Sequence, residues 1–356
     1  MRGLGKAALL AAFAAGAMAP AGAAVAAPVS AAPAAASWQI DLKVTGSSMP
    51  QFTAVTAGGA TSAWAFEAAG SAAPKAYQFD GSGWTAQPFP DPKGDQVFSA
   101  SADSPTDAWA FSFQDRVLHY DGSNWTIVKR FAKPVESGLA ISSSNVWVFG
   151  QSFAPELGTW HYNGATWTKV SSGGGLNGAS ALSANSIWAY GGTNVAHWNG
   201  STWKKTSVKS LIPKNGEFTR WQVTGIVPIS SASVYAIASG GKQDVGGPIA
   251  VLHYNGHAWT RLVLTRAAGG PVGVSGDGSG GLWIPTLAYN SPGQSGMDHF
   301  AHGALHVTTL PYAPAHLFLY GVATAPHGKV AFTVGFYHKQ KFDPTATTAV
   351  ILRYGS

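Results

Sequence analysis

Five histidines occupy one position of a repeated sequence pattern, and histidine is both a common metal ligand and a common acid–base group. They are His119, His161, His197, His253 and His299. Two further copies of the pattern carry Gln78 or Arg353 at this position. Equivalent positions of a repeat lie in separate structural units, whereas a metal needs ligands that converge within about 2–2.5 Å of one point. We therefore predict that each histidine hydrogen-bonds a neighbouring strand or unit, and we expect neither a metal nor a cofactor.

Carboxyl groups are the second set of side chains that could take part in catalysis, because glycoside hydrolysis uses two of them roughly 5–9.5 Å apart. The long connections between repeated elements contain Glu156, Asp244, Asp298 and Asp343. No motif or spacing pairs any two of these residues. The sequence therefore identifies no catalytic residue.

The elements that carry these side chains are repeated β-hairpins. The copies cover residues 79–85, 118–126, 162–168, 198–203 and 254–260. Each has an aromatic residue, then Asp-Gly or Asn-Gly, then a Trp that is usually followed by Thr. Glycine tolerates positive φ and Asp and Asn tolerate it better than other residues, so the pair predicts a tight turn between two strands.

A short run with large residues at alternate positions precedes each hairpin, and this period of two places them on one face of a strand. The runs contain Trp64, Trp109, Trp147, Trp188, Tyr235, Trp283 and Phe332, at successive separations of 45, 38, 41, 47, 48 and 49 residues. Four strands fit each unit; in the second unit they cover residues 97–101, 108–113, 117–120 and 125–129. Four-stranded units of roughly 40–50 residues are typical of β-propeller blades. No segment has the period and caps of a helix.

The seventh unit ends at Ser356, where its fourth strand should begin, and residues 37–42 supply the missing strand. The predicted fold is therefore all-β, a seven-bladed β-propeller of four-stranded blades, with the ring closed by the N-terminal strand of the mature chain, residues 37–356. The sixth unit deviates most. Its hairpin has no Trp, and Pro285 is expected to interrupt its second strand because proline cannot donate a ladder hydrogen bond.

The Tyr-Asp-Gly-Ser-x-Trp-Thr repeats resemble those of secreted bacterial β-propellers of the kelch-like and Asp-box-like kind, over nearly all of the mature chain. The chain departs from both patterns: only Gly191-Gly192 matches the kelch glycine pair, and no unit has Ser-x-Asp before its Gly and Trp. The chemistry of related enzymes is not carried over. The kelch-type copper oxidases need a cysteine, which this chain lacks, and no motif selects a sialidase arginine triad.

The N-terminus and the composition indicate export. Residues 1–26 have a basic start, an apolar run and an Ala-x-Ala site, which together predict a secretory signal peptide, and residues 27–36 form an Ala/Pro-rich spacer. No other apolar run approaches the length of a membrane span. The absence of cysteine excludes a disulfide framework. Loss of Arg2 and Lys6 lowers the net charge from +6 to +4, and the cations form no continuous stripe, so a nucleic-acid partner is not expected.

Loop lengths predict where a ligand binds. The links between the first and second and between the third and fourth strands of a blade lie on one face, which we call the short-turn face. The links between the second and third strands and between consecutive blades lie on the opposite, long-loop face, and several are long, which suits binding. The predicted ligand-binding residues are Arg220, Trp221, Tyr289, Asp298, Tyr337 and His338. We predict a secreted, monomeric binding or scaffold module for an extracellular glycan or protein. The alternative is a secreted glycan-processing enzyme, either a sialidase-like hydrolase or a polysaccharide lyase.

Overall fold

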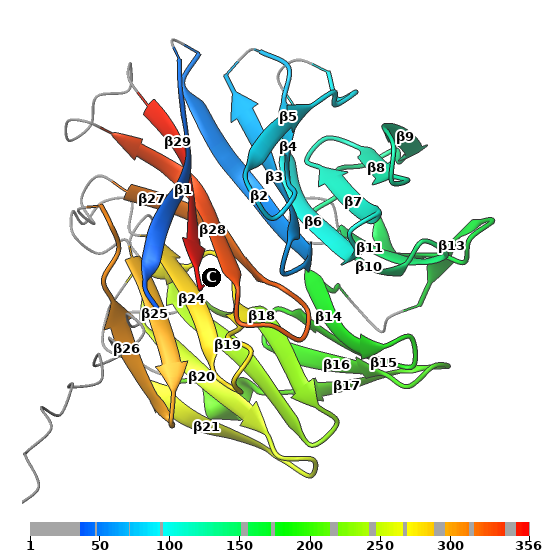
Figure 1. Cartoon of the computed structure of the whole chain (residues 1–356). Coiled ribbons are helices and arrows are strands. Elements are labelled where there is room, and N and C mark those ends of the chain that lie inside the picture. The colour runs from blue at the N-terminus through cyan, green and yellow to red at the C-terminus, as the bar shows by residue number, and fades with distance from the viewer. Residues whose placement is uncertain are drawn as a thin grey trace, which may run out of the picture. The chain divides into compact units, whose positions relative to one another are not determined.

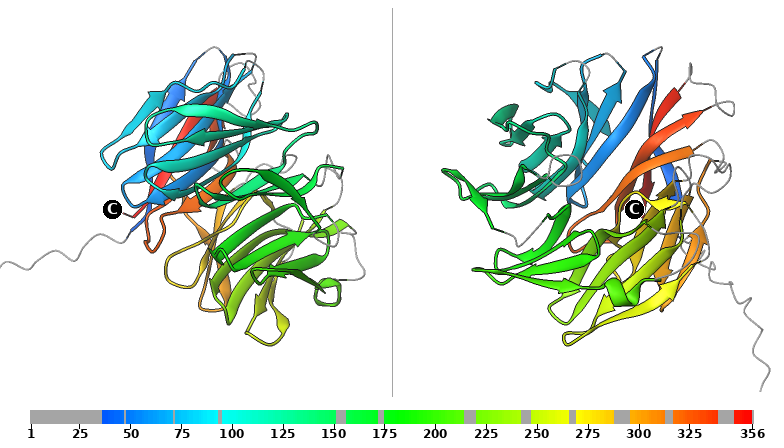
Figure 2. Two further views of the ribbon diagram at one scale, coloured as in Figure 1. Left: turned by 90° about the vertical axis from the view of Figure 1, so that its right-hand side faces the viewer. Right: turned by 180° about the vertical axis from the view of Figure 1, so that it is seen from behind.

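Seven antiparallel sheets follow one another along the chain and around a ring (Figure 1, Figure 2). The structure is a computed structural model that describes residues 36–355 except 47, 71, 93–94, 151–155, 172–174, 214–219, 242–246, 266–268, 288–295, 313–316 and 339–346. The predicted signal peptide and residues 27–35 lie outside the described residues. The prediction of a seven-bladed β-propeller is confirmed.

Each of the first four blades is a meander of four strands in chain order. Blade 1 consists of β2 (Pro50–Gly59), β3 (Ser62–Ala69), β4 (Lys75–Phe79) and β5 (Trp84–Gln87). Blade 2 consists of β6 (Val97–Ser104), β7 (Asp107–Ser112), β8 (Arg116–Tyr120) and β9 (Trp125–Arg130). Blade 3 consists of β10 (Ser137–Ser142), β11 (Asn145–Gly150), β12 (Gly158–Tyr162) and β13 (Trp167–Val170). Blade 4 consists of β14 (Gly178–Ser183), β15 (Ser186–Gly191), β16 (Asn194–Trp198) and β17 (Trp203–Ser207).

The remaining blades vary this plan. Blade 5 consists of β18 (Arg220–Ser230), β19 (Ser233–Gly241), β20 (Ile249–Tyr254) and β21 (Trp259–Leu264), and a short 3-10 helix, η1 (Lys209–Leu211), precedes it. Blade 6 consists of β22 (Gly270–Pro271), β23 (Ser275–Gly276), β24 (Leu282–Leu287), β25 (Gly296–Ala301) and β26 (Ala304–Thr308). Blade 7 consists of β27 (Leu317–Thr324), β28 (Ala331–His338), β29 (Thr347–Tyr354) and β1 (Trp38–Thr45).

The two ends of the chain pair to close the ring, as predicted. Strand β1 runs antiparallel to β29, with Trp38 opposite Tyr354 and Thr45 opposite Thr348 (Figure 1, blue beside red). Trp38 is 3% exposed and packs edge-on against Trp283 of blade 6, at 5.3 Å between ring centroids. Asp41 of the same strand accepts a hydrogen bond from Trp84 Nε1 of blade 1 at 2.7 Å and pairs with Arg353 at 3.1 Å. The N-terminal strand therefore joins three blades.

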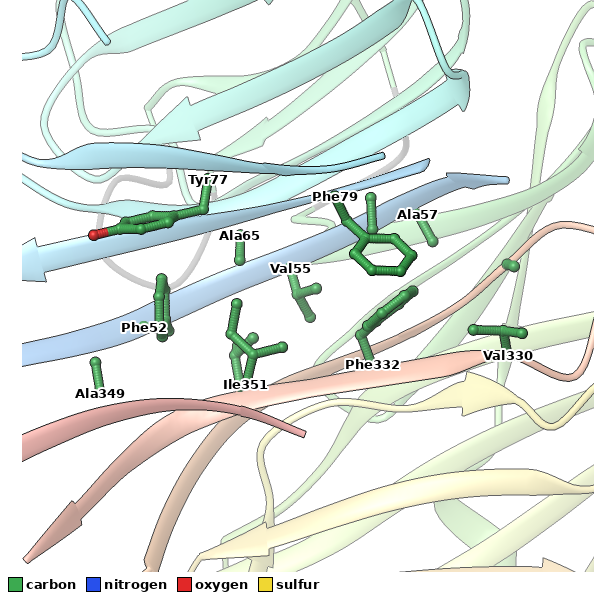
Figure 3. Close-up of a cluster of buried hydrophobic side chains, with 13 residues drawn as sticks. Phe52, Val55, Ala57, Ala65, Tyr77, Phe79, Val330, Phe332, Ala349 and Ile351 are labelled. Atoms are coloured by element: carbon green, nitrogen blue, oxygen red, sulfur yellow. The ribbon is translucent and has the colours of Figure 1, made fainter. Parts of the chain in front are cut away.

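The core is divided into one hydrophobic cluster for each pair of neighbouring blades. Figure 3 shows the cluster between blades 7 and 1, where Phe79 and Phe332 meet edge to face with ring centroids 5.2 Å apart. Alternation in the second strands produces this division. In β3, Trp64 and Phe66 pack toward blade 2, whereas Ala63 and Ala65 pack toward blade 7. The second strand of blade 1 thus presents large side chains to blade 2 and small ones to blade 7.

The aromatic residues of the repeated hairpins connect neighbouring blades. Tyr120 and Trp125 of blade 2 pack on Trp64 of blade 1, with ring centroids 4.6 and 5.1 Å apart. Tyr254 and Trp259 of blade 5 pack on Trp188 of blade 4 in the same way, at 5.2 and 5.9 Å. The sequence repeat therefore encodes the contact between consecutive blades as well as the hairpin itself.

Blade 6 is irregular in its first strand and not, as expected, in its second strand. We expected Pro285 to interrupt the second strand, but β24 is continuous across it and pairs Pro285 with Met297. The interruption lies in the first strand instead, which is divided into β22 and β23 on either side of residues 272–274. The proline has no N–H, and its carbonyl accepts a hydrogen bond from Val272 N. Because Pro285 has no N–H to donate back, the pairing is interrupted in the first strand, between β22 and β23, and β24 itself stays continuous.

Candidate functional site

The turns of the short-turn face use their polar side chains internally. Asp121 Oδ1 accepts hydrogen bonds from the backbone N–H groups of Ser123 and Asn124, both at 2.9 Å. The same arrangement recurs at Asp80, Asn163, Asn199 and Asn255. Hydrogen bonds from the backbone of Asn124 and Ser123 lower the pKa of Asp121. These residues therefore serve the turn geometry, as the repeat implies.

The five repeated histidines pack against the aromatic residue of the adjacent second strand, and four of them stack on it, whereas His253 is tilted by 33° to Tyr235. Ring-centroid distances range from 4.0 Å for Trp283–His299 to 4.7 Å for Tyr235–His253. Each Nε2 shares a hydrogen bond of 2.7–3.1 Å with a polar residue at or before the start of that strand. The partners of His119, His161, His197, His253 and His299 are Asp107, Asn145, Ser186, Ser233 and Asp277. The prediction that they bond a neighbouring strand is confirmed.

Burial acts in opposite directions on the pKa values of the repeated histidines and of the carboxyl groups that bond them. It lowers the pKa of His161, His197 and His253, whose partners are uncharged, and the charge of Lys204 adds to the effect at His197. Burial alone would raise the pKa of Asp277, but hydrogen bonds from His299 and from two backbone N–H groups outweigh it, so the pKa is lowered. No group of three or more His, Cys, Asp or Glu side chains in the described part of the chain is arranged to hold a metal.

Bulges in the first strands of the blades shape the central channel. In blades 2 and 7 the extra, unpaired residues are Phe98 and Tyr320, because the register shifts between Val97 and Ser99 and between Leu319 and Gly321. A bulge re-aims the side chain of the extra residue. Phe98 and Tyr320 both line the channel, a cavity of about 310 Å³, together with Tyr190 of blade 4. Phe98 is 38% exposed.

Further aromatic side chains gather at the long-loop end of blade 7. Phe318 and Phe336 stack in parallel, with ring centroids 4.8 Å apart and an interplanar angle of 5°. His338 meets both rings edge-on at 5.5 and 5.0 Å, and Tyr320 lies 5.8 Å from Phe336. His338 Nδ1 is buried and has no hydrogen-bond partner within the described residues.

A second aromatic contact lies in blade 2, where Phe113 packs on Phe98 with ring centroids 4.4 Å apart.

Five of the six predicted ligand-binding residues are described, and their placement on loops was wrong. Arg220 and Trp221 begin β18, Tyr337 and His338 end β28, and Asp298 is within β25. The strands continue because their backbones pair beyond the point where the side-chain pattern fades, as in Arg220 opposite Gly241 and His338 opposite Thr347. Tyr289 lies outside the described residues.

These residues belong to separate packing groups. Trp221 packs between blades 4 and 5, where Gly240 leaves room for it: a Cβ there would be 2.6 Å from the indole. Tyr337 packs between blades 6 and 7 against Tyr312, at 4.4 Å. Arg220 is exposed. Asp298 is a half-buried carboxyl group, and burial raises its pKa to about 6.

The sequence did not reveal an ionic group at the long-loop end of blade 2. Arg116 Nη1 contacts both Asp95 and Asp91, the latter at 3.3 Å, and Ser112 donates to Asp95. Burial and the neighbouring Asp95 raise the pKa of Asp91 to about 7, although Arg116 opposes this. Asp115 lies 3.4 Å from Arg116 Nε. This group ties the link between blades 1 and 2 to blade 2.

Comparison with known proteins shows the fold and no family. No family model matches the sequence, and no curated protein matches it. The chain is similar to the structure of YCF48 bound to a D1 peptide, with a TM-score of 0.57 and 14% identity over 88% of this chain and 96% of that one. It is similar to the WD40 β-propeller domain of Doa1, with a TM-score of 0.60 and 10% identity over 88% and 96%. It also resembles the extracellular domain of BT4673 from B. thetaiotaomicron, with a TM-score of 0.61 and 10% identity, over 89% of this chain and 40% of that one.

Proposed function

We propose that this protein is an exported binding module that holds an extracellular protein or glycan on its long-loop face, near the mouth of the channel. The observation that carries the proposal is the set of aromatic side chains from different blades at this end of the molecule. Phe98 and Tyr320 line the channel itself, and Phe318, Phe336 and His338 gather beside it in blade 7. Half-buried aromatic rings are the side chains that most often anchor a partner.

The contrast between the two faces supports the same assignment. On the short-turn face, the Asp and Asn side chains of the repeated hairpins are already bonded to their own backbones. These carboxylate and amide oxygens are therefore already engaged in the turns. The long-loop face instead carries strand ends with unrelated side chains, such as the exposed Arg220 and the half-buried Trp221.

A protein or peptide partner is consistent with the comparisons. YCF48, whose structure contains a bound D1 peptide, has the same fold as this chain. Neighbours include both WD40 domains and the extracellular domain of BT4673. We also propose that the chain is exported, because residues 1–26 have the basic start, apolar run and Ala-x-Ala site of a signal peptide. Among the described residues, no helix has the length and hydropathy to span a membrane.

The enzyme alternative would place two carboxyl groups across a cleft. Of the four acidic residues named for it, Asp244 and Asp343 lie outside the described residues. Asp298 has a raised pKa, which suits a general acid, but it lies within β25. We propose binding as the function because the described residues bring aromatic side chains together at the mouth of the channel.

The experiment is a screen of the purified mature protein against peptide and glycan arrays, followed by affinity measurements on variants. Phe98→Ala should weaken binding by more than about 1 kcal/mol if the ring is an anchor. Phe98 is 38% exposed and packs on Phe113, so its removal should lower stability by less than the removal of a fully buried ring. Trp221→Ala and Tyr337→Ala should weaken binding by a similar amount, but their melting temperatures must be measured because both rings also pack between blades.

The matched controls are Asp121→Ala and Asn163→Ala in the short-turn face. These changes remove turn hydrogen bonds, so they should lower stability and leave affinity unaltered. The assignment is wrong if a ligand is found whose affinity depends on these two positions and not on Phe98, Trp221 or Tyr337.

A further inference from the structure

A groove on the outer rim between blades 4 and 5 is lined by aromatic and basic side chains. Its volume is about 350 Å³. The lining combines the rings of Trp188, Tyr254 and Trp259 with the polar groups of Lys204, His197 and His257. It lies along β17 and the hairpin between β20 and β21, apart from the aromatic residues of the long-loop face. The following inference therefore does not depend on the proposed function.

Two residues of the groove depart from the repeat. Lys204 follows the hairpin Trp of blade 4, where four other blades have Thr85, Thr126, Thr168 and Thr260. His257 occupies a hairpin position of blade 5 that other blades fill with Ser82, Ser123, Ala165 and Ser201. Neither side chain takes part in the turn, because Asn255 Oδ1 accepts the turn hydrogen bonds from the backbone N–H groups of His257 and Ala258. Exceptions from two different blades thus meet in one groove.

The groove lacks an aromatic residue that packs on the hairpin Trp at two other blade interfaces. Between blades 1 and 2, Phe89 packs edge-on against Trp125 at 5.4 Å. Between blades 2 and 3, Phe131 packs against Trp167 at 5.6 Å. Between blades 4 and 5, the smaller Leu211 lies in the lining. The corresponding space between blades 1 and 2 is about 200 Å³.

The charge around the groove is of one sign. Residues 178–264 contain seven Lys and Arg residues against two Asp and Glu residues, whereas residues 50–130 contain five against eight. Within the described residues of blades 4 and 5 there is no Asp or Glu at all. Lys204 makes no ion pair with any described residue, and Arg261 donates to Leu211 O at the edge of the groove, at 2.9 Å. The fold therefore gathers cations that are scattered in the sequence.

We infer that this groove binds a glycan that carries carboxylate groups. The half-buried indole of Trp259 offers an apolar face for a sugar ring, and Lys204 and His257 supply positive charge or donors for its carboxylate. The hydroxyl groups of Thr206, Ser207 and Ser210 in the lining suit the hydroxyls of a sugar. An acidic peptide would satisfy the charge but would leave the ring face and these hydroxyls without matching groups.

The test uses the mature protein and oligogalacturonate, a chain of sugars with one carboxylate each, in calorimetric titrations. We expect binding that weakens as salt is added, since the contact is partly exposed. The neutral galactose oligomer of the same length should not bind. Lys204→Thr should weaken oligogalacturonate binding at least about tenfold, the scale of a lost charge-assisted hydrogen bond. Thr is the residue of four other blades at this position, so the variant should fold.

Lys329→Thr is the matched control, because it removes one exposed lysine from blade 7 and should leave the affinity unchanged. His257→Ser should weaken binding by a smaller factor than Lys204→Thr. The inference is overturned if oligogalacturonate does not bind, or if it binds Lys204→Thr as tightly as the unmodified protein. It is also overturned if a poly-glutamate peptide binds the groove more tightly than the oligosaccharide does.

Discussion

The histidine of each of five blades is fixed on two sides, by packing against an aromatic ring and by a hydrogen bond to the start of the second strand. In blade 2 a single carboxyl group, Asp107, bonds both His119 Nε2 and Trp109 Nε1, at 2.7 and 2.8 Å. In blade 3, Asn145 does the same for His161 and Trp147, at 3.0 Å in both cases. One polar residue therefore orients two side chains, which gives the recurring histidine a structural role.

The uncharged partners in blades 3, 4 and 5 make stability depend on pH. Burial lowers the pKa of His161, His197 and His253 below the unfolded value of 6.5, so in this range the unfolded chain binds more protons than the native protein. Their contribution to stability is complete above pH 6.5 and is lost as the pH falls from this value through the lowered pKa values of the native protein. Asp91, Asp103 and Asp298 act in the opposite direction, because their pKa values are raised to about 7, 6 and 6.

A triple variant separates the two contributions. His161→Gln, His197→Gln and His253→Gln should reduce the loss of stability between about pH 7.5 and about pH 5, measured by urea unfolding, because the carboxyl contributions cancel in the difference. Glutamine is suited to the position, since blade 1 has Gln78 there. Equal pH dependence in the variant and the unmodified protein would show that these histidines are not held neutral by the fold.

At the scale of elements, the strands and their pairing are readable from the sequence because side chains alternate along them. The four strands expected in the second unit, and the closing strand at residues 37–42, agree with β6–β9 and β1 to within a few residues. The bulges at Phe98 and Tyr320 are not readable, because an extra residue is fixed by the partner strand and not by its own type. The sequence therefore did not predict Phe98 and Tyr320 as residues of the channel, and it predicted residues at the ends of β18 and β28 as ligand-binding instead.

The same distinction explains the loop assignments. Tyr337 and His338 follow the last large alternating residue of the seventh unit, so the pattern ends before the strand does. Their backbones continue to pair with Thr348 and Thr347. Backbone hydrogen bonding needs no particular side chain, so a strand can extend beyond its sequence signal.

Closure of the ring by β1 predicts a large effect from a residue near the chain terminus. Trp38→Ala should lower the free energy of unfolding by about 3–5 kcal/mol, because a buried indole is removed from the cluster between blades 6 and 7. The control is Ile40→Ala two residues later, whose side chain is 38% exposed and should change stability by less than about 1 kcal/mol. Similar melting temperatures for the two variants would mean that β1 does not hold the ring together.

At the scale of the whole molecule, stability is divided among interfaces that each join two neighbouring blades. Linear repeat arrays with such nearest-neighbour contacts can lose repeats from their ends. Here the pairing of β1 with β29 removes the free ends, because blade 7 contains both termini of the described chain. Residues 36–356 form one compact unit. A ring whose ends are joined should therefore unfold as one cooperative body.

Phe332→Ala tests this cooperativity at the interface between blades 7 and 1. Phe332 is fully buried and packs on Phe79 of blade 1 with ring centroids 5.2 Å apart (Figure 3). It also packs on Trp84 of blade 1, at 5.4 Å. Its removal should lower the free energy of unfolding by about 3–5 kcal/mol. The slope of that free energy against denaturant concentration, which scales with the surface exposed on unfolding, should stay the same, because one interface cannot open without the others. A smaller slope, or two transitions seen by Trp fluorescence and far-ultraviolet circular dichroism, would instead show that the ring opens at this interface and that its blades unfold in succession.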